Sequence, residues 1–201
     1  LATDHLPQGS WVNVSTLEAR RYRCGYCGAI VGSREGWYYV GEHSMQHEAY
    51  ICICPVCNKP TFLEDNRQVP MPLPGNPVSG IPSEEVRMLY EEARRALSAQ
   101  AYTAAVMACR KLLMNIAVHE GAEPGKRFEY YVSYLHSNQL TPPRSEDWVN
   151  RIRTKGNEAN HDIHIMAEDD AVEILDFVEM LLKYIYEYPA KLAKNQSEGS
   201  T

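Results

Sequence analysis

The chain has 201 residues, of which 44% are hydrophobic and 23% are charged, and its formal net charge at pH 7 is −6. These values are typical of a globular protein with one ordinary domain and one small one, and they exclude a chain that is disordered throughout. The acidic net charge argues against wrapping of duplex nucleic acid by a broadly basic surface, because that mode of binding needs cations to neutralise phosphates.

Neither a membrane span nor a secretion signal is evident in the sequence. No stretch approaches the roughly 20 apolar residues that cross a bilayer, and no charged segment followed by an apolar one opens the chain. We therefore expect a cytoplasmic protein with no membrane partner. Four of the six cysteines form C-x-x-C pairs, which favours metal binding over disulfide formation.

The two C-x-x-C pairs lie in the first third of the chain. They are Cys24 with Cys27, and Cys54 with Cys57. Two residues between the thiolates let both sulfurs reach one ion from a tight turn, and small or turn-forming residues such as Gly25 and Pro55 relieve crowding there. Four thiolates make a closed tetrahedron with no position for a catalytic water, so the pattern predicts one structural Zn²⁺. A redox role for the pairs is the alternative that this spacing disfavours.

Short strands are predicted between the two pairs. Residues 37–40 and 49–53 have the aromatic and β-branched content of strands, and we expect them to form an antiparallel hairpin. The sequence therefore predicts a β zinc ribbon over residues 1–66. Its hydrophobic core would be small, so metal binding should contribute much of its folding free energy.

Three more residues of the ribbon carry groups that bind metals. Cys52 would share a strand face with Cys54, either as a small core residue or as an occasional substitute ligand. His43 and His47 have the spacing of one helical face, although two histidines without further ligands more often mark a solvated loop.

Arginines and aromatic residues also gather in the ribbon. The candidates for contact with single-stranded nucleic acid are Arg23, Arg34, Trp37 and Tyr38. Such residues could combine stacking on bases with phosphate contacts. The alternative is that the aromatic side chains form the core of the hairpin and that the arginines are solvated.

A proline-rich linker is predicted over residues 67–82. Five prolines and two glycines between Glu64 and Ser83 exclude a helix and disfavour a central strand, which leaves an extended, semi-rigid connector.

Helical periodicity dominates residues 83–190. Ser83 is a plausible N-cap for the first helix, and apolar residues then recur at helical spacing. We expect further helices over about 101–120 and 128–140, from about 145, and from 171 to just before Pro189. A helical bundle is the predicted fold, with a disordered tail over 191–201.

Polar residues cluster in the fourth predicted helix. Arg153, Asn157 and His161 are spaced four apart, so on a continuous helix they could converge on one ligand or on each other. One interpretation is a catalytic site. The other is that Asn157 and His161 belong to a buried hydrogen-bond network that holds two helices in register.

Three motifs in order give the helical region a family resemblance. They are Ala105-x-x-Ala108-Cys109-Arg110-x-x-Leu113, Ile152-Arg153-x-x-Gly156-Asn157-x-Ala159-Asn160-His161, and Leu182-x-x-Ile185-Tyr186 before Pro189. Together they resemble Domain of Unknown Function 4145. That family is grouped with the HEPN-type helical bundles, many of which are dimeric, metal-independent ribonucleases of bacterial toxin–antitoxin and antiphage systems. The resemblance implies a mainly α chain, in which a small β zinc ribbon precedes a HEPN-like helical bundle that forms a homodimer.

If the resemblance extends to activity, it implies roles for three residues. His161 would be the general acid/base for attack of a 2′-hydroxyl, Arg153 would stabilise the pentacovalent phosphate, and Asn157 would orient one of them. Active HEPN proteins have four to six residues between the arginine and the histidine, whereas seven separate Arg153 from His161. Arg110 could reach the same site or could be a buried structural arginine.

Two functions from different classes therefore remain. The first is a binding or regulatory module of a bacterial or phage defence system, which contacts RNA, DNA or a protein partner. The second is a metal-independent endoribonuclease that uses Arg153 and His161. The acidic net charge favours the first, and the polar cluster around Arg153 favours the second.

Overall fold

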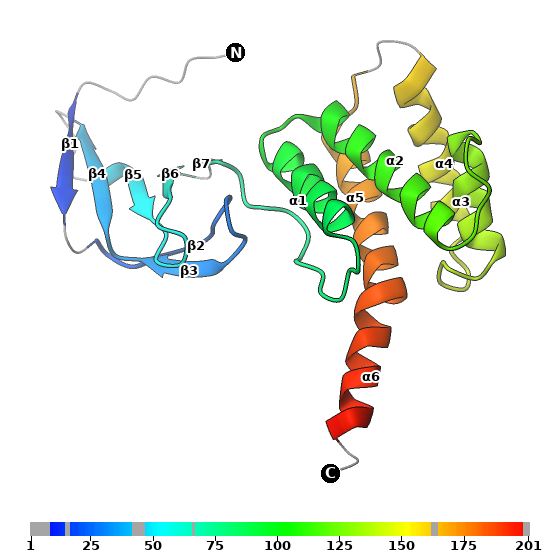
Figure 1. Cartoon of the computed structure of the whole chain (residues 1–201). Coiled ribbons are helices and arrows are strands. Elements are labelled where there is room, and N and C mark those ends of the chain that lie inside the picture. The colour runs from blue at the N-terminus through cyan, green and yellow to red at the C-terminus, as the bar shows by residue number, and fades with distance from the viewer. Residues whose placement is uncertain (1–8, 15–16, 42–46, 66, 162–164, 199–201) are drawn as a thin grey trace. The chain divides into compact units, whose positions relative to one another are not determined.

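The computed structural model describes residues 9–14, 17–41, 47–65, 67–161 and 165–198. The chain folds as two compact units, Leu1–Leu73 and Pro74–Thr201. A small β unit thus precedes a helical one (Figure 1), as the sequence predicts. None of the helices in these described ranges is long and apolar enough to cross a membrane.

Antiparallel strands build the first unit. In its described residues, five of them form one sheet in the order β1-β4-β5-β6-β7, and β2 pairs with β3 in a separate hairpin. Their bounds are β1 Gly9–Val14, β2 Arg20–Arg23, β3 Ile30–Ser33, β4 Gly36–Gly41, β5 His47–Ile53, β6 Pro60–Glu64 and β7 Arg67–Val69. Trp37 pairs with Ile51 across β4 and β5, which confirms the predicted hairpin.

The core of this unit lies around the cysteines. Alternate residues of each strand point to one face, so Tyr22 from β2 and Tyr50 from β5 are buried beside Cys52 and Cys54. Arg20 covers this core from one side, with its guanidinium carbon 3.6 Å from the centre of the Tyr50 ring. Aromatic side chains therefore serve as core here, next to the residues that could hold a metal.

The segment over residues 67–82, which the sequence predicts to be one linker, is divided between the two units. Its first part belongs to the β unit, because β7 pairs with β6 and the Gln68 side chain donates a hydrogen bond of 2.8 Å to the Arg23 carbonyl. Its last part, from Pro74 onward, belongs to the helical unit. Prolines exclude a helix, but they do not prevent an extended chain from adding an edge strand or from packing on helices.

Helices account for the second unit. They are α1 Glu84–Ser98, α2 Tyr102–His119, α3 Phe128–Ser137, α4 Glu146–His161, α5 Glu168–Leu182 and α6 Tyr188–Glu198, with a π-helical turn, η1 Lys183–Glu187, between the last two. Ser83 is the N-cap of α1 as predicted, since its hydroxyl accepts a hydrogen bond from the Val86 N–H. The core combines the apolar faces of α1 to α5, including Leu97, Leu112, Ile116, Leu135, Ile152 and Phe177.

The C-terminal helix differs from the sequence-based expectation. The sequence predicts that helical structure stops before Pro189 and that a disordered tail follows over 191–201, yet α6 runs to Glu198. Proline clashes with the carbonyl of the fourth preceding residue and donates no hydrogen bond. The wider turn of η1 lies at that point and accommodates Pro189, so that α6 follows directly on α5 and η1 (Figure 1).

Polar side chains of the helices hold residues 74–79 in place. Arg94, of which 1% is exposed, donates to the carbonyl of Pro74 at 2.8 Å and to that of Gly75 at 3.3 Å. The carboxylate of Glu187 accepts a hydrogen bond of 2.8 Å from the Ser79 N–H. The beginning of the helical unit is therefore fixed by buried hydrogen bonds before the first helix starts.

Candidate metal centre and helical pocket

The structure brings together the four cysteines that the sequence pairs as C-x-x-C. Their sulfur atoms all lie within 4.8 Å of one another. Cys24 Sγ lies 3.7 Å from Cys57 Sγ, and Cys27 Sγ lies 3.8 Å from Cys54 Sγ. These distances are far longer than a disulfide bond of about 2.05 Å. They match the separation of about 3.8 Å between thiolates that each lie about 2.3 Å from one tetrahedral ion.

Two turns of the same design carry the cysteines. The first joins β2 to β3 and the second joins β5 to β6. In the first, the Gly28 N–H donates to the Cys24 carbonyl at 2.9 Å, and in the second the Asn58 N–H donates to the Cys54 carbonyl at 2.8 Å. Gly28 and Asn58 both have a positive φ, of 73° and 56°, which glycine and asparagine tolerate best. Each C-x-x-C pair is therefore held by its own hairpin.

The four sulfurs differ in their electrostatic environment. Burial raises the pKa of Cys27 to about 12, so that without a cation this side chain would stay a neutral thiol. At Cys54 burial acts in the same direction, but the backbone N–H groups of Cys57 and Val56 outweigh it and hold the pKa below its usual value. The donor set is compatible with a metal site, and four thiolates would leave no coordination position for a substrate.

The other metal-binding groups of the ribbon do not join this cluster in the described residues. Cys52 is fully buried in the core beside Tyr50, where burial raises the pKa of its thiol. His43 lies outside the described residues. His47 is the first residue of β5, but its side chain is also outside the described part.

The candidate nucleic-acid contacts of the ribbon lie in different surroundings. Trp37 and Tyr38 are successive residues of β4, so their side chains point to opposite faces of the sheet, and Tyr38 packs against the cysteine core. Arg23 is half-buried, and its Nε donates to the Gly28 carbonyl at 3.2 Å in the first cysteine turn. Arg34 is exposed. The structure therefore does not gather these four residues on one surface.

The candidate catalytic residues Arg153, Asn157 and His161 all belong to α4. Because this helix is continuous, His161 lies eight positions after Arg153, which corresponds to about 12 Å along the helix axis. The side chains of Asn157 and His161 lie outside the described residues. Arg153 is half-buried and donates a hydrogen bond of 2.9 Å to the Asn150 Oδ1 atom.

Arg110 is a buried arginine of the helical core. Only 7% of it is exposed, its guanidinium carbon lies 4.2 Å from the centre of the Phe128 ring, and burial lowers its pKa. Its Nη1 atom has no hydrogen-bond partner among the described residues. Packing on an aromatic ring in the core accounts for this arginine without a role in a ligand site.

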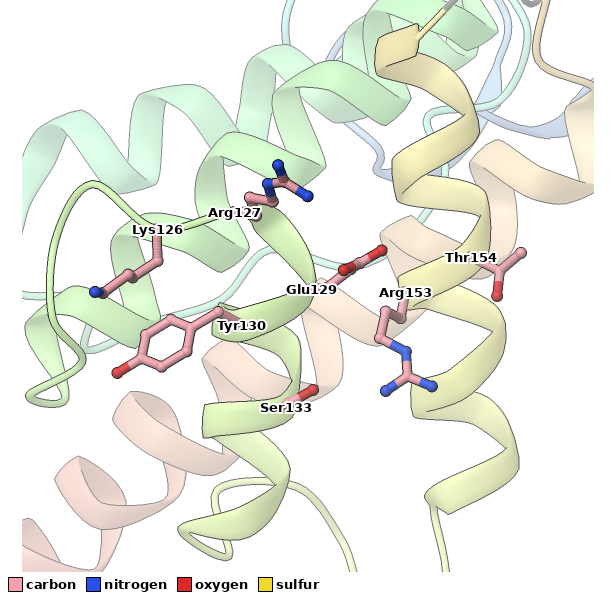
Figure 2. Close-up of a pocket in the computed structure, with 7 residues that line it drawn as sticks. All are labelled: Lys126, Arg127, Glu129, Tyr130, Ser133, Arg153 and Thr154. Carbon is pink, nitrogen blue, oxygen red and sulfur yellow. The ribbon is translucent and has the colours of Figure 1, made fainter.

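A surface pocket of about 790 Å³, wide open to solvent, lies at α3 and α4 (Figure 2). The described residues that line it are Lys126, Arg127, Glu129, Tyr130, Ser133, Arg153 and Thr154. Of these residues, only Arg153 is among the candidates that the sequence predicts. The other lining residues could have been found from the two adjacent cations Lys126 and Arg127, which directly precede a predicted helix.

Comparison with known proteins identifies a family for the helical unit. The family described as "Domain of unknown function (DUF4145)" matches residues 91–198, which is more than half of the 201 residues. No curated protein matches the chain, and no solved structure does.

Proposed function

We propose that this chain, which belongs to the family of unknown function DUF4145, is a zinc-stabilised binding module that contacts nucleic acid or a protein partner. The cluster of four cysteine sulfurs, all within 4.8 Å of one another, carries the proposal. Zinc is the ion that most often occupies a four-thiolate tetrahedron, and such closed sites are structural. The metal would therefore hold the ribbon folded and present its surface to a partner.

A closed metal site supports binding rather than catalysis. Cys24, Cys27, Cys54 and Cys57 would fill the coordination sphere, and no water could be activated on the ion. The separation of about 12 Å between Arg153 and His161 along α4 also makes it difficult for one phosphate to contact both residues of one chain. A module that only binds its partner needs neither an open position on the metal nor an arginine and a histidine close together.

The second candidate function is a metal-independent endoribonuclease that uses Arg153 and His161, with Asn157 orienting one of them. The observation that favours it is the position of Arg153 in a pocket with Lys126 and Arg127, where positive charge could stabilise a phosphate in the transition state. His161 would then act as the general acid/base. A homodimer could bring His161 of one chain to Arg153 of the other.

One experiment tests both functions. A mixed pool of labelled RNA is incubated with the zinc-loaded protein in magnesium-free buffer, and both retention and cleavage are measured. RNA that is bound and recovered intact supports the binding module. Cleavage by the wild type but not by His161→Ala, with equal melting temperatures, would instead establish the ribonuclease. If the RNA is neither bound nor cut, the proposed module requires a protein partner.

The biological setting is part of the proposal. The family resemblance of the sequence supports a place in a bacterial or phage defence system. Self-association is supported by three exposed apolar residues at a spacing of four along the last helical segment, Tyr184, Tyr188 and Leu192. Sedimentation of the full chain over a range of concentrations tests for the homodimer.

A further inference from the structure

We infer that the pocket at α3 and α4 binds the backbone phosphates of a single-stranded nucleic acid and that Tyr130 stacks on one of its bases. This inference rests on the proposed function, because it names the ligand of the helical unit of a binding module. It does not involve the ribbon or its metal.

The charge of the pocket suits an anionic ligand. Lys126, Arg127 and Arg153 bring three positive charges to its lining, against one carboxylate, that of Glu129. Lys126 also lies 3.0 Å from Glu123, but both side chains are exposed at the surface, where such a pair adds little. The excess of positive charge is notable in a chain whose net charge is −6.

Arg153 differs from the neighbouring cations of α4. Arg151 Nε lies 2.6 Å from the Glu173 carboxylate, and Lys155 pairs with Asp170, so both of these cations are neutralised by α5. Arg153 instead donates to the neutral amide of Asn150, and within the described ranges no carboxylate forms an ion pair with it. Its charge is therefore available for a ligand, and a guanidinium matches the geometry of a phosphate.

The start of α3 adds to the positive potential of the pocket. Arg127 occupies the N-cap position and makes no side-chain capping bond, so the positive end of the helix dipole lies in the pocket beside two cationic side chains. The Ser133 hydroxyl of the lining is a further donor for phosphate or ribose oxygens, whereas the Thr154 hydroxyl already donates to the Asn150 carbonyl at 3.0 Å.

The arrangement of the lining favours a chain of nucleotides over one small anion. Figure 2 shows Arg153 extending from α4 toward α3, whereas Tyr130 of α3 and Lys126, from the loop before α3, extend on the other side of α3. A ligand that contacts both groups must cross α3, and a nucleic acid strand is long enough to do so and carries a phosphate for each side. Tyr130 is 37% exposed, and its ring offers a stacking surface that only an unpaired base can use.

The test is fluorescence anisotropy with a labelled single-stranded RNA of about 12 nucleotides, a length within the range that single-strand-binding sites cover. The full zinc-loaded chain is compared with Arg153→Gln and Tyr130→Ala. Arg151→Gln is the matched control for charge, because it removes a cation of the same helix that pairs with α5. Met88→Ala, on α1, is the control for loss of an exposed apolar side chain outside the pocket.

We expect Arg153→Gln to weaken binding about 5- to 10-fold and to lower the slope of log affinity against log salt by about 1. Tyr130→Ala should weaken it at least about fivefold, as loss of one stacked base does. The affinity of both controls for the RNA should stay within about twofold of that of the wild type, because the loss of one surface contact changes it little. Melting curves of all variants should coincide.

Several results would overturn the inference. Equal losses in Arg151→Gln and Arg153→Gln would show that the strand only senses overall charge. If duplex RNA binds more tightly than the single strand, Tyr130 does not stack on an unpaired base. If pyrophosphate competes as well as the oligonucleotide does, the ligand of the pocket is a small anion. If only the double variant of the ribbon, Arg23→Gln with Arg34→Gln, loses binding, the pocket is not the binding site. The proposed binding function would still hold in that case.

Discussion

Glu179 on α5 accepts two hydrogen bonds from Asn76, a residue 103 positions earlier in the chain. The backbone N–H of Asn76 donates at 2.7 Å and its side-chain amide at 2.9 Å. The Tyr90 hydroxyl donates to the Asn76 carbonyl at 2.9 Å, so α1 and α5 hold this residue together. Because Asn76 belongs to the proline-rich segment, the chain is already attached to the helical unit before α1 begins.

The carboxylate of Glu179 should be important for the stability of the helical unit. Glu179→Gln keeps the size of the side chain but removes the charge that strengthens both bonds from Asn76, and we expect a loss of about 2 kcal/mol in the free energy of unfolding. Urea denaturation followed by the helical circular-dichroism signal measures it. Asp169→Asn, an exposed carboxylate in the first turn of α5, is the control and should change little. Equal effects of the two variants would contradict a specific role for Glu179.

The same carboxylate makes stability depend on acid pH. Burial alone would raise the pKa of Glu179, but the Lys183 ammonium and the donors of Asn76 outweigh it and hold the pKa below the ordinary 4.5. The pKa of Glu187 is lowered as well, by Lys191 and the Ser79 N–H. A lowered pKa in the folded state stabilises the fold fully above pH 4.5, and this contribution is lost as pH falls below it through the folded-state pKa. The free energy of unfolding of the wild type should thus decrease from about pH 6 to pH 3. In Glu179→Gln this decrease should be smaller, and identical pH profiles would count against the assignment.

The parts of the fold that the sequence predicts are those set by local chemistry. Two residues between paired cysteines, followed by Gly28 or Asn58, describe a turn that a few consecutive residues determine. The hairpin of β4 and β5 and the start of α1 at Ser83 likewise follow from short-range patterns. Each of these features needs no information from distant parts of the chain.

The parts that the sequence does not predict depend on distant partners. Prolines around Asn76 indicate an extended segment, but nothing in them identifies Glu179 as the partner that fixes it. Similarly, the pocket beside Arg153 forms only because α3 packs on α4 and brings Arg127 nearby. The continuation past Pro189 requires a π-helical turn, which has no clear sequence pattern.

Removal of the metal should unfold the ribbon and leave the helices folded. In the described part of the chain, the buried residues of the helical core lie between Val78 and Leu182 and include none of the four clustered cysteines. We expect about one zinc per chain, as one four-thiolate site requires, and loss of β structure but not of the helical signal on chelation. Cys24→Ser should lose the zinc. The buried Cys52→Ser should retain it, and equal zinc loss in both variants would show that Cys52 is a ligand.

Gly25, inside the first cysteine turn, should tolerate no side chain. A Cβ atom at this position would lie 2.3 Å from the Met71 carbonyl oxygen and 2.7 Å from that of Pro70. Since both are backbone atoms held beside β7, Gly25→Ala should destabilise the ribbon by about 1–3 kcal/mol. Metal binding and folding of such a small unit are coupled, so the apparent zinc affinity should fall by about 5- to 150-fold. Competition with a zinc chelator of known affinity measures this change. Gly32→Ala is the matched control, because its Cβ would meet nothing within 4 Å. An affinity of Gly25→Ala equal to that of Gly32→Ala would mean that residues 70 and 71 move aside and do not brace the turn.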